Sequence, residues 1–201
     1  EGGFAPPIAD VSFPLELMLR AARAADVVSR VRFGLDVAAS SLYADGAYRV
    51  SGKTLSSEEL RRLYGDLHRA YALCAIEDPF HEDASADFAA LVADGLFVVG
   101  DDLTTTNPAQ IRQAIDARGI SAAIIKPNQI GTLSDTFEAI RVLRAANMPH
   151  IVSHRSGDTP DDCIADLAWA TSAYAVKMGG LHNGERVAKY NRLWDLSRGM
   201  L

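Results

Sequence analysis

The sequence has few cysteines, no long hydrophobic run and no excess of positive charge. Its two cysteines, Cys74 and Cys163, lie far apart, so they imply no disulfide framework and are expected to be small buried residues in a reducing compartment. No apolar stretch approaches the ~20 residues of a membrane span, and no segment resembles a charged-then-apolar signal peptide. These absences predict a soluble, cytoplasmic protein without a membrane span.

The charge balance argues against a nucleic-acid partner. The 201 residues carry 20 Lys and Arg against 26 Asp and Glu, a formal net charge of -6, so neutralisation of a phosphate backbone is not expected. No Gly-x-Gly-x-x-Gly or P-loop pattern follows an expected strand, which leaves a nucleotide without its phosphate cradle. An anionic substrate would therefore need a local basic pocket.

Short apolar strands alternate with amphipathic helices along the chain. Strands are expected at 31–37, 73–76, 96–99, 122–125, 151–153 and 174–176, with a hairpin around Asp45-Gly46. Helices are expected from Ser12, from the capping box Ser56-x-x-Glu59, at 85–94, from Asn107, from Ser134, from Thr159-Pro160 and at 184–196. This alternation predicts an α/β fold with a parallel sheet, either doubly wound or a (β/α)8 barrel.

Polar residues at the strand ends favour the barrel. Each expected strand ends at or just before a charged residue, and the carboxyl ends of barrel strands converge on the face that carries active sites. About six strand-helix units are present, two fewer than a complete barrel contains. The predicted fold is therefore an incomplete (β/α)8 TIM-like barrel over residues 1–201.

Three carboxylates follow successive strands, at Asp36, Glu77 and Asp101. A single charged residue after a strand usually faces solvent or caps the next helix, but three oxygen ligands at converging strand ends suit Mg²⁺. Asp78 and Asp102 adjoin two of these residues, and spacing alone leaves open which member of each pair faces a metal. Asp102 has the further interpretation of orienting its neighbours or capping.

Basic and hydroxyl side chains follow the later strands. Lys126 is a candidate base if a low dielectric and a metal lower its pKa, although a surface lysine is an equally good interpretation of the local sequence. His154, Arg155 and Ser156 form a donor cluster suited to phosphate or carboxylate, and Lys177 adds a second lysine. Together these residues predict a site for a polyanionic substrate bridged by a metal.

Seven segments, in order, resemble the enolase family. They cover essentially the whole chain, and the most specific are Lys-Pro-Asn-Gln-Ile-Gly at 126–131 and Ser-His-Arg-Ser-Gly at 153–157. The others are 1–6, 34–40, 76–80, 100–103 and 186–191. The resemblance implies a magnesium-dependent lyase of glycolysis that reversibly dehydrates 2-phosphoglycerate to phosphoenolpyruvate.

The resemblance also implies a role for each matching residue. Asp36, Glu77 and Asp101 would bind Mg²⁺. Lys126 would remove the proton next to the substrate carboxylate, and Glu1 would belong to the acid machinery that helps the hydroxyl leave. Four residues would bind the substrate. Arg155 and Ser156 would hold its phosphate, Lys177 would pair with its carboxylate, and His154 would lie beside it.

The sequence departs from the family pattern in three places. Residues 180–183 read Gly-Leu-His-Asn where the family usually has a small residue, proline, another residue and arginine, and Ser41 stands where glutamate is common. The family's amino-terminal domain and first barrel elements, with a serine, a histidine and an acidic residue, are not found. Because the chain starts at Glu1, the natural protein is expected to extend further, and residues 1–201 alone are expected to be inactive.

Two other functions compete with this interpretation. One is a truncated, non-catalytic enolase paralogue acting as a binding module, since the family is known for surface display and RNA-processing partners. The other is a related enzyme for a different acid, which Ser153-His154-Arg155-Ser156 disfavours. Retention of the whole charged set favours catalysis. The resemblance further implies a homodimer or octamer for the full-length protein.

Overall fold

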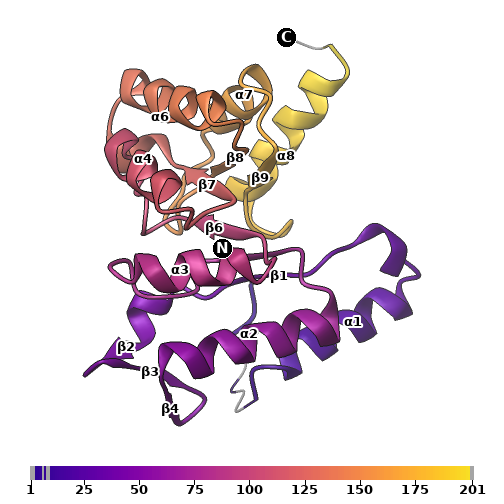
Figure 1. Cartoon of the computed structure of the whole chain (residues 1–201). Coiled ribbons are helices and arrows are strands. Elements are labelled where there is room, and N and C mark those ends of the chain that lie inside the picture. Colours follow the sequence, from indigo (N-terminus) through magenta and orange to yellow (C-terminus); the bar gives the residue numbers. More distant parts are fainter. Residues whose placement is uncertain (1–2, 6, 8–9, 200–201) are drawn as a thin grey trace. The chain divides into compact units, whose positions relative to one another are not determined.

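The computed structural model describes residues 3–5, 7 and 10–199, which form two compact units (Figure 1). The first unit comprises Pro6–Leu103 and Gln113–Ser121. The second comprises Glu1–Ala5, Thr104–Arg112 and Ala122–Leu201. The division passes through α4 (Pro108–Asp116).

The first unit contains three short parallel strands with helices between them. Its strands β1 (Gly34–Asp36), β5 (Ala75–Glu77) and β6 (Val98–Gly100) pair in register, with Leu35 opposite Ile76 and Ile76 opposite Val98. Its helical segments are α1 (Phe13–Ala24), η1 (Val28–Arg30), η2 (Ala39–Leu42), α2 (Ser57–Tyr71) and α3 (Ser85–Ala93). One hydrophobic core joins them, including Leu15 of α1, Leu60 of α2 and Phe88 of α3.

A small antiparallel sheet interrupts this alternation. The predicted hairpin is confirmed by β2 (Tyr43–Ala44) and β3 (Ala47–Val50), and the positive φ of Asp45 (53°) and Gly46 (82°) fits a type I′ turn. A second turn at Ser51-Gly52 leads into β4 (Lys53–Leu55), a strand that the sequence analysis did not predict.

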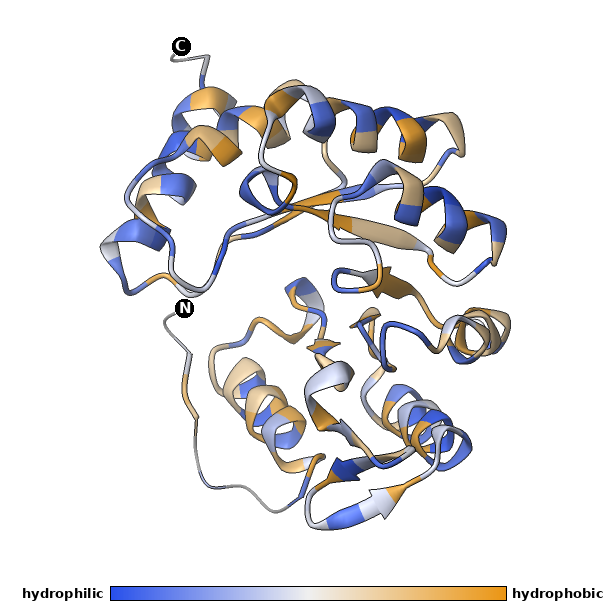
Figure 2. Ribbon diagram, turned by 90° about the vertical axis from the view of Figure 1, so that its left-hand side faces the viewer, coloured by the Kyte–Doolittle hydropathy of each residue, from blue (hydrophilic) through white to orange (hydrophobic). Residues whose placement is uncertain are grey.

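The second unit repeats the parallel arrangement. Its strands β7 (Ala122–Ile125), β8 (His150–Ser153) and β9 (Ala175–Lys177) are paired in that order. Its helices are α5 (Pro127–Ile130), α6 (Leu133–Ala145), α7 (Cys163–Ala170) and α8 (Gly184–Ser197). Helix α6 packs on β7, α7 on β8, and α8 on α7. Figure 2 shows hydrophobic strands and helices of mixed hydropathy, as expected when a buried parallel sheet is covered by amphipathic helices.

Three expectations about individual segments were wrong. Cys74 and Cys163 are both exposed, because one immediately precedes β5 and the other opens α7 at its solvated end. The helix expected from Thr159-Pro160 begins only at Cys163. The strand expected at 31–37 is reduced to Gly34–Asp36 after the 3-10 turn η1.

Helices alternate with parallel strands in both units, so the α/β prediction is confirmed. Within the described residues there are six such strands, β1 and β5 to β9. Across the same residues, no helix is both long enough and apolar enough to cross a membrane.

Candidate active site

Acidic side chains lie at the carboxyl ends of all three parallel strands of the first unit. Asp36 and Glu77 are the last residues of β1 and β5 and are register partners, and Asp101 directly follows β6. Glu77 and Asp101 are buried, at 8% and 7% exposed, whereas Asp36 is exposed. Parallel pairing of the strands thus gathers the three predicted metal ligands at one edge of this unit.

Asp78 organises this edge through the backbone. Its φ of 42° is in the left-handed region, which Asp tolerates better than most residues and which often marks functional sites. Its Oδ1 accepts the backbone N–H of Asp101 at 2.9 Å, and its Oδ2 accepts that of Asp102 at 2.7 Å. The carboxylate therefore fixes the turn that carries Asp101.

The carboxylates of Asp78, Asp101 and Asp102 form a tight acidic cluster. One oxygen from each lies within 4.8 Å of the others. Burial raises the pKa of Asp78 to about 6, opposed by the two backbone hydrogen bonds and reinforced by the charges of Asp101 and Asp102. Such a concentration of negative charge favours a cation that takes oxygen ligands. The cluster contains one predicted metal ligand, Asp101.

Lys126 stands at the start of the second unit's helical segment α5. It directly follows β7 and occupies the N-cap position of α5, half-buried. The hydroxyl of the buried Thr106 accepts the Lys126 backbone N–H at 2.9 Å and donates to Oε1 of Gln129 at 2.9 Å. Thr105 and Thr106 have φ values of 44° and 57°, which are strained for β-branched residues. This strained turn fixes the backbone that carries the lysine.

The loop after β8 carries the predicted substrate-binding residues. His154 is buried, whereas Arg155 and Ser156 are exposed. The His154 backbone N–H donates to the carbonyl of Lys177, the half-buried last residue of β9, at 2.9 Å. The second unit therefore brings His154 close to Lys177, with Arg155 and Ser156 next in the chain.

Two buried cations from α8 hold this loop in place. Arg186 and Lys189 are each 1% exposed. Arg186 donates to the carbonyls of Arg155 and Ser156 at 2.8 and 2.7 Å, and Lys189 donates to the carbonyl of Thr159 at 2.7 Å. Asp158 lies 3.6 Å from the Lys189 ammonium and supplies counter-charge.

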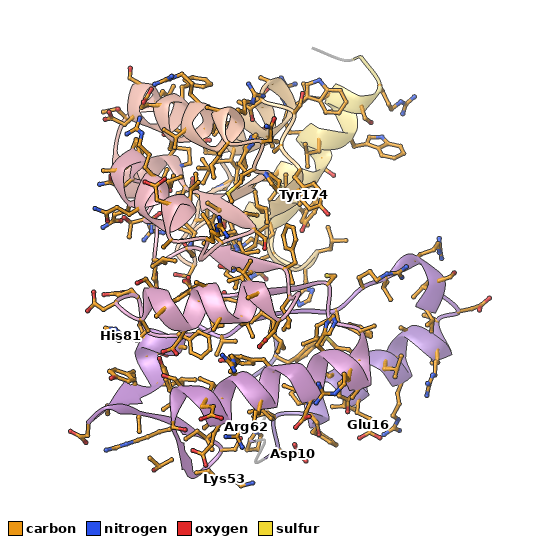
Figure 3. The ribbon with its side chains drawn as sticks, viewed as in Figure 1. Asp10, Glu16, Lys53, Arg62, His81 and Tyr174 are labelled. Carbon is orange, nitrogen blue, oxygen red and sulfur yellow. The ribbon has the colours of Figure 1, made fainter. Side chains whose placement is uncertain are left out.

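A cavity of about 310 Å³ in the second unit adjoins the loop. His154, Arg155 and Lys189 contribute to its wall, together with Asn128 from α5. The first unit has a separate groove near α2, lined by side chains of both signs that include Asp10, Lys53 and Arg62 (Figure 3). The loop cavity is also lined by side chains of both signs, since Asp158 and Asp161 accompany Arg155 and Lys189.

Three residues of this site were not predicted from the sequence: Thr106, Arg186 and Lys189, which touch the backbone beside the candidate residues. Asp78 was named from the sequence only as an alternative to Glu77 for facing a metal. The spacing of Arg186 and Lys189, three apart on a helix, was the available signal for a shared face. Glu1 lies outside the described residues, and the divergent segment at 180–183 leads into α8, whose N-cap is Asn183.

The fold and the strand-end residues indicate the class of protein to which the chain belongs. Parallel strands alternating with helices, with acidic and basic groups after their carboxyl ends, are typical of TIM-barrel domains. Residues 1–199 match the sequence model of the family described as "Enolase, C-terminal TIM barrel domain". The chain belongs to the enolase family.

Curated relatives agree with this assignment. The chain is similar to the enolase of Aeropyrum pernix, with 45% identity over 98% of the chain and 46% of the relative. For the enolase of Methanocaldococcus jannaschii the identity is 42%, over 96% of the chain and 46% of the relative. For the enolase of Campylobacter jejuni the identity is 39%, over 98% of the chain and 48% of the relative. The chain thus spans about half the length of these relatives.

Proposed function

We propose that the protein containing this chain is a cytoplasmic lyase of glycolysis that interconverts 2-phosphoglycerate and phosphoenolpyruvate. The observation that supports it most is the set of charged residues after the strands, found in a member of the enolase family. Carboxylates end β1 and β5 and follow β6, and cationic residues follow β7 and β8 and end β9. An anionic substrate held with a divalent cation requires both kinds of group.

The metal ligands in this proposal are Asp36, Glu77 and Asp101. The donor set fits Mg²⁺, because every candidate ligand is a carboxylate oxygen. Asp78 holds the Asp101 backbone and so orients that ligand. When bound, Mg²⁺ stabilises the second negative charge that develops on the substrate carboxylate as its α-proton is removed.

Lys126 is the proposed general base. Its backbone is fixed by Thr106, which reduces the freedom of the side chain before the substrate arrives. Arg155 and Ser156 bind the phosphate, Lys177 pairs with the substrate carboxylate, and His154 contacts the substrate. Glu1 belongs to the acid machinery that assists departure of the hydroxyl. These roles divide proton removal, binding and leaving-group assistance among different residues.

The remaining parts of the proposal concern the whole protein. We infer that residues 1–201 are part of one barrel domain whose other elements lie in further sequence, and that the full protein is a homodimer or octamer.

The test compares Lys126→Ala with Lys53→Ala in the natural protein. Lys53 is an exposed lysine of β4, far in sequence from the strand-end residues, and serves as the matched control (Figure 3). Lys126→Ala should slow exchange of the substrate α-proton with solvent by about 10²–10⁴-fold, the usual contribution of a positioned base, while substrate still binds. Lys53→Ala should retain the exchange rate.

Three outcomes would contradict parts of the proposal. A wild-type protein that forms no phosphoenolpyruvate with saturating Mg²⁺ would favour a non-catalytic binding module. Activity that survives complete removal of divalent cations would exclude the metal site. Normal exchange per bound substrate in Lys126→Ala would make this lysine an electrostatic clamp rather than the base.

A further inference from the structure

Arg186 contacts the imidazole of His154 as well as the loop backbone. Its Nη1 lies 2.7 Å from Nδ1 of His154, and both side chains are buried. The same guanidinium donates to the carbonyls of Arg155 and Ser156, so three acceptors fix its position. This arrangement is rigid, because a planar guanidinium cannot turn away from one acceptor without disturbing the others.

The contact determines where the imidazole carries its proton. A guanidinium has only donors, and it stays protonated in proteins. Nδ1 must therefore be the acceptor and cannot hold a hydrogen. A neutral histidine without a proton on Nδ1 carries it on Nε2, and a second positive charge on the ring would face the guanidinium directly.

We propose that Arg186 locks His154 as the neutral Nε2–H tautomer, so that neither ring nitrogen of His154 can act as the proton acceptor. The enolase-type mechanism can use a lysine or a histidine as base, and both Lys126 and His154 follow strands of the second unit. In the locked tautomer, Nδ1 is occupied by Arg186 and Nε2 is already protonated. The inference rests on the proposed function and removes His154 as an alternative base to Lys126.

Lys189, the other buried cation of α8, allows the effect of Arg186 on the His154 tautomer to be distinguished from a purely structural effect on the loop. Lys189 holds the same loop, but its ammonium donates to the carbonyls of Thr159 and Glu185 and not to the imidazole. Loss of either cation should loosen the loop. Only loss of Arg186 should release Nδ1 of His154.

The first measurement uses the wild-type natural protein without substrate turnover. Two-bond ¹H–¹⁵N correlation spectra of histidine-labelled protein report which ring nitrogen is protonated, and His154→Gln assigns the signals. A single Nε2–H tautomer is expected. A protonated Nδ1, or a doubly protonated ring near neutral pH, would overturn the inference even if the protein is an active enolase.

The second measurement compares Arg186→Met with Lys189→Met. In Arg186→Met, His154 should change from one tautomer to a mixture that includes Nδ1–H, whereas in Lys189→Met it should remain Nε2–H. A mixture in both variants would assign the effect to loop packing and overturn the role of Arg186. The spectra do not depend on catalysis. If the wild-type protein formed no phosphoenolpyruvate, the proposed function would be rejected, but the tautomer of His154 could still be determined.

Discussion

Several buried polar side chains form hydrogen bonds with backbone groups of the loops. Asp78 accepts two consecutive N–H groups, Thr106 accepts that of Lys126, and Arg186 binds two consecutive carbonyls. A buried backbone group without a partner is costly, so each of these side chains stabilises one particular loop path. Candidate catalytic residues lie next to each path, which limits their freedom before a substrate binds.

His150 of β8 gives a pH-dependent contribution to stability. Its Nε2 lies 3.0 Å from the Thr171 hydroxyl, which itself donates to the carbonyl of Leu167, so Nε2–H is the donor. Burial, with a smaller effect from the Arg144 charge, lowers the pKa of His150 below its ordinary 6.5. The unfolded chain therefore binds this proton more readily, and stability should fall as pH drops through about 6.5.

Replacing His150 with a side chain that does not titrate tests the predicted direction of the pH dependence of stability. His150→Gln can still donate to Thr171, so the free energy of unfolding should depend less steeply on pH between about 7 and 5 than in wild type. Urea unfolding across that range measures both slopes. Equal slopes would show that His150 does not contribute to the acid sensitivity.

At the scale of single elements, the start of α2 offers a local test. The Ser56 hydroxyl accepts the Glu59 backbone N–H at 3.3 Å, and the Glu59 carboxylate accepts the Ser56 N–H at 2.8 Å. Ser56→Ala should lower stability by about 1 kcal/mol, the usual effect of losing a helix cap. Because the two bonds form one reciprocal motif, Glu59→Ala in the Ser56→Ala background should cost less than it does alone.

A double-mutant cycle by urea unfolding measures this coupling. Strictly additive losses would mean that the two bonds act independently. Glu58→Ala, at a neighbouring position outside the capping box, is the control and should be additive with Ser56→Ala.

Sequence predicted best those elements whose cause is local. The Asp45-Gly46 hairpin and the Ser56 cap were foreseen because each depends on residues within a few positions. The predicted start of α7 was wrong partly because a distant residue, Lys189, binds the Thr159 carbonyl. Locally, Asp161 accepts the Cys163 N–H, and the helix begins only at Cys163. The periodicity of the sequence predicted where the strand-end residues lie. It could not predict that Arg186 contacts His154 or that Asp78 accepts the Asp101 N–H, because these partners are far apart in the sequence.

At the scale of the whole molecule, residues 1–201 should form no phosphoenolpyruvate on their own. A complete barrel has eight parallel strands, and the described residues contain six, so strand edges remain to be paired. The family resemblance also places a serine, a histidine and an acidic residue of the site in other sequence. Without them the developing charge lacks part of its preorganised environment.

The measurement is phosphoenolpyruvate formation by the purified 201-residue chain with saturating Mg²⁺. The natural full-length protein, assayed at equal concentration, is the control, and adding the missing part as a separate chain should restore some activity if the pieces associate. Turnover by residues 1–201 alone near that of the full-length protein would show that the chain is self-sufficient.

The position of Arg186 and Lys189 in the chain has a consequence during protein synthesis. The loop that they hold leaves the ribosome about 30 residues before them, since Ser156 and Thr159 precede their partners by that distance. At roughly 5–20 residues per second, the loop waits on the order of two to six seconds without its buried donors. Strands β7 and β8 can pair during this interval, but the substrate loop takes its final path only after α8 has emerged.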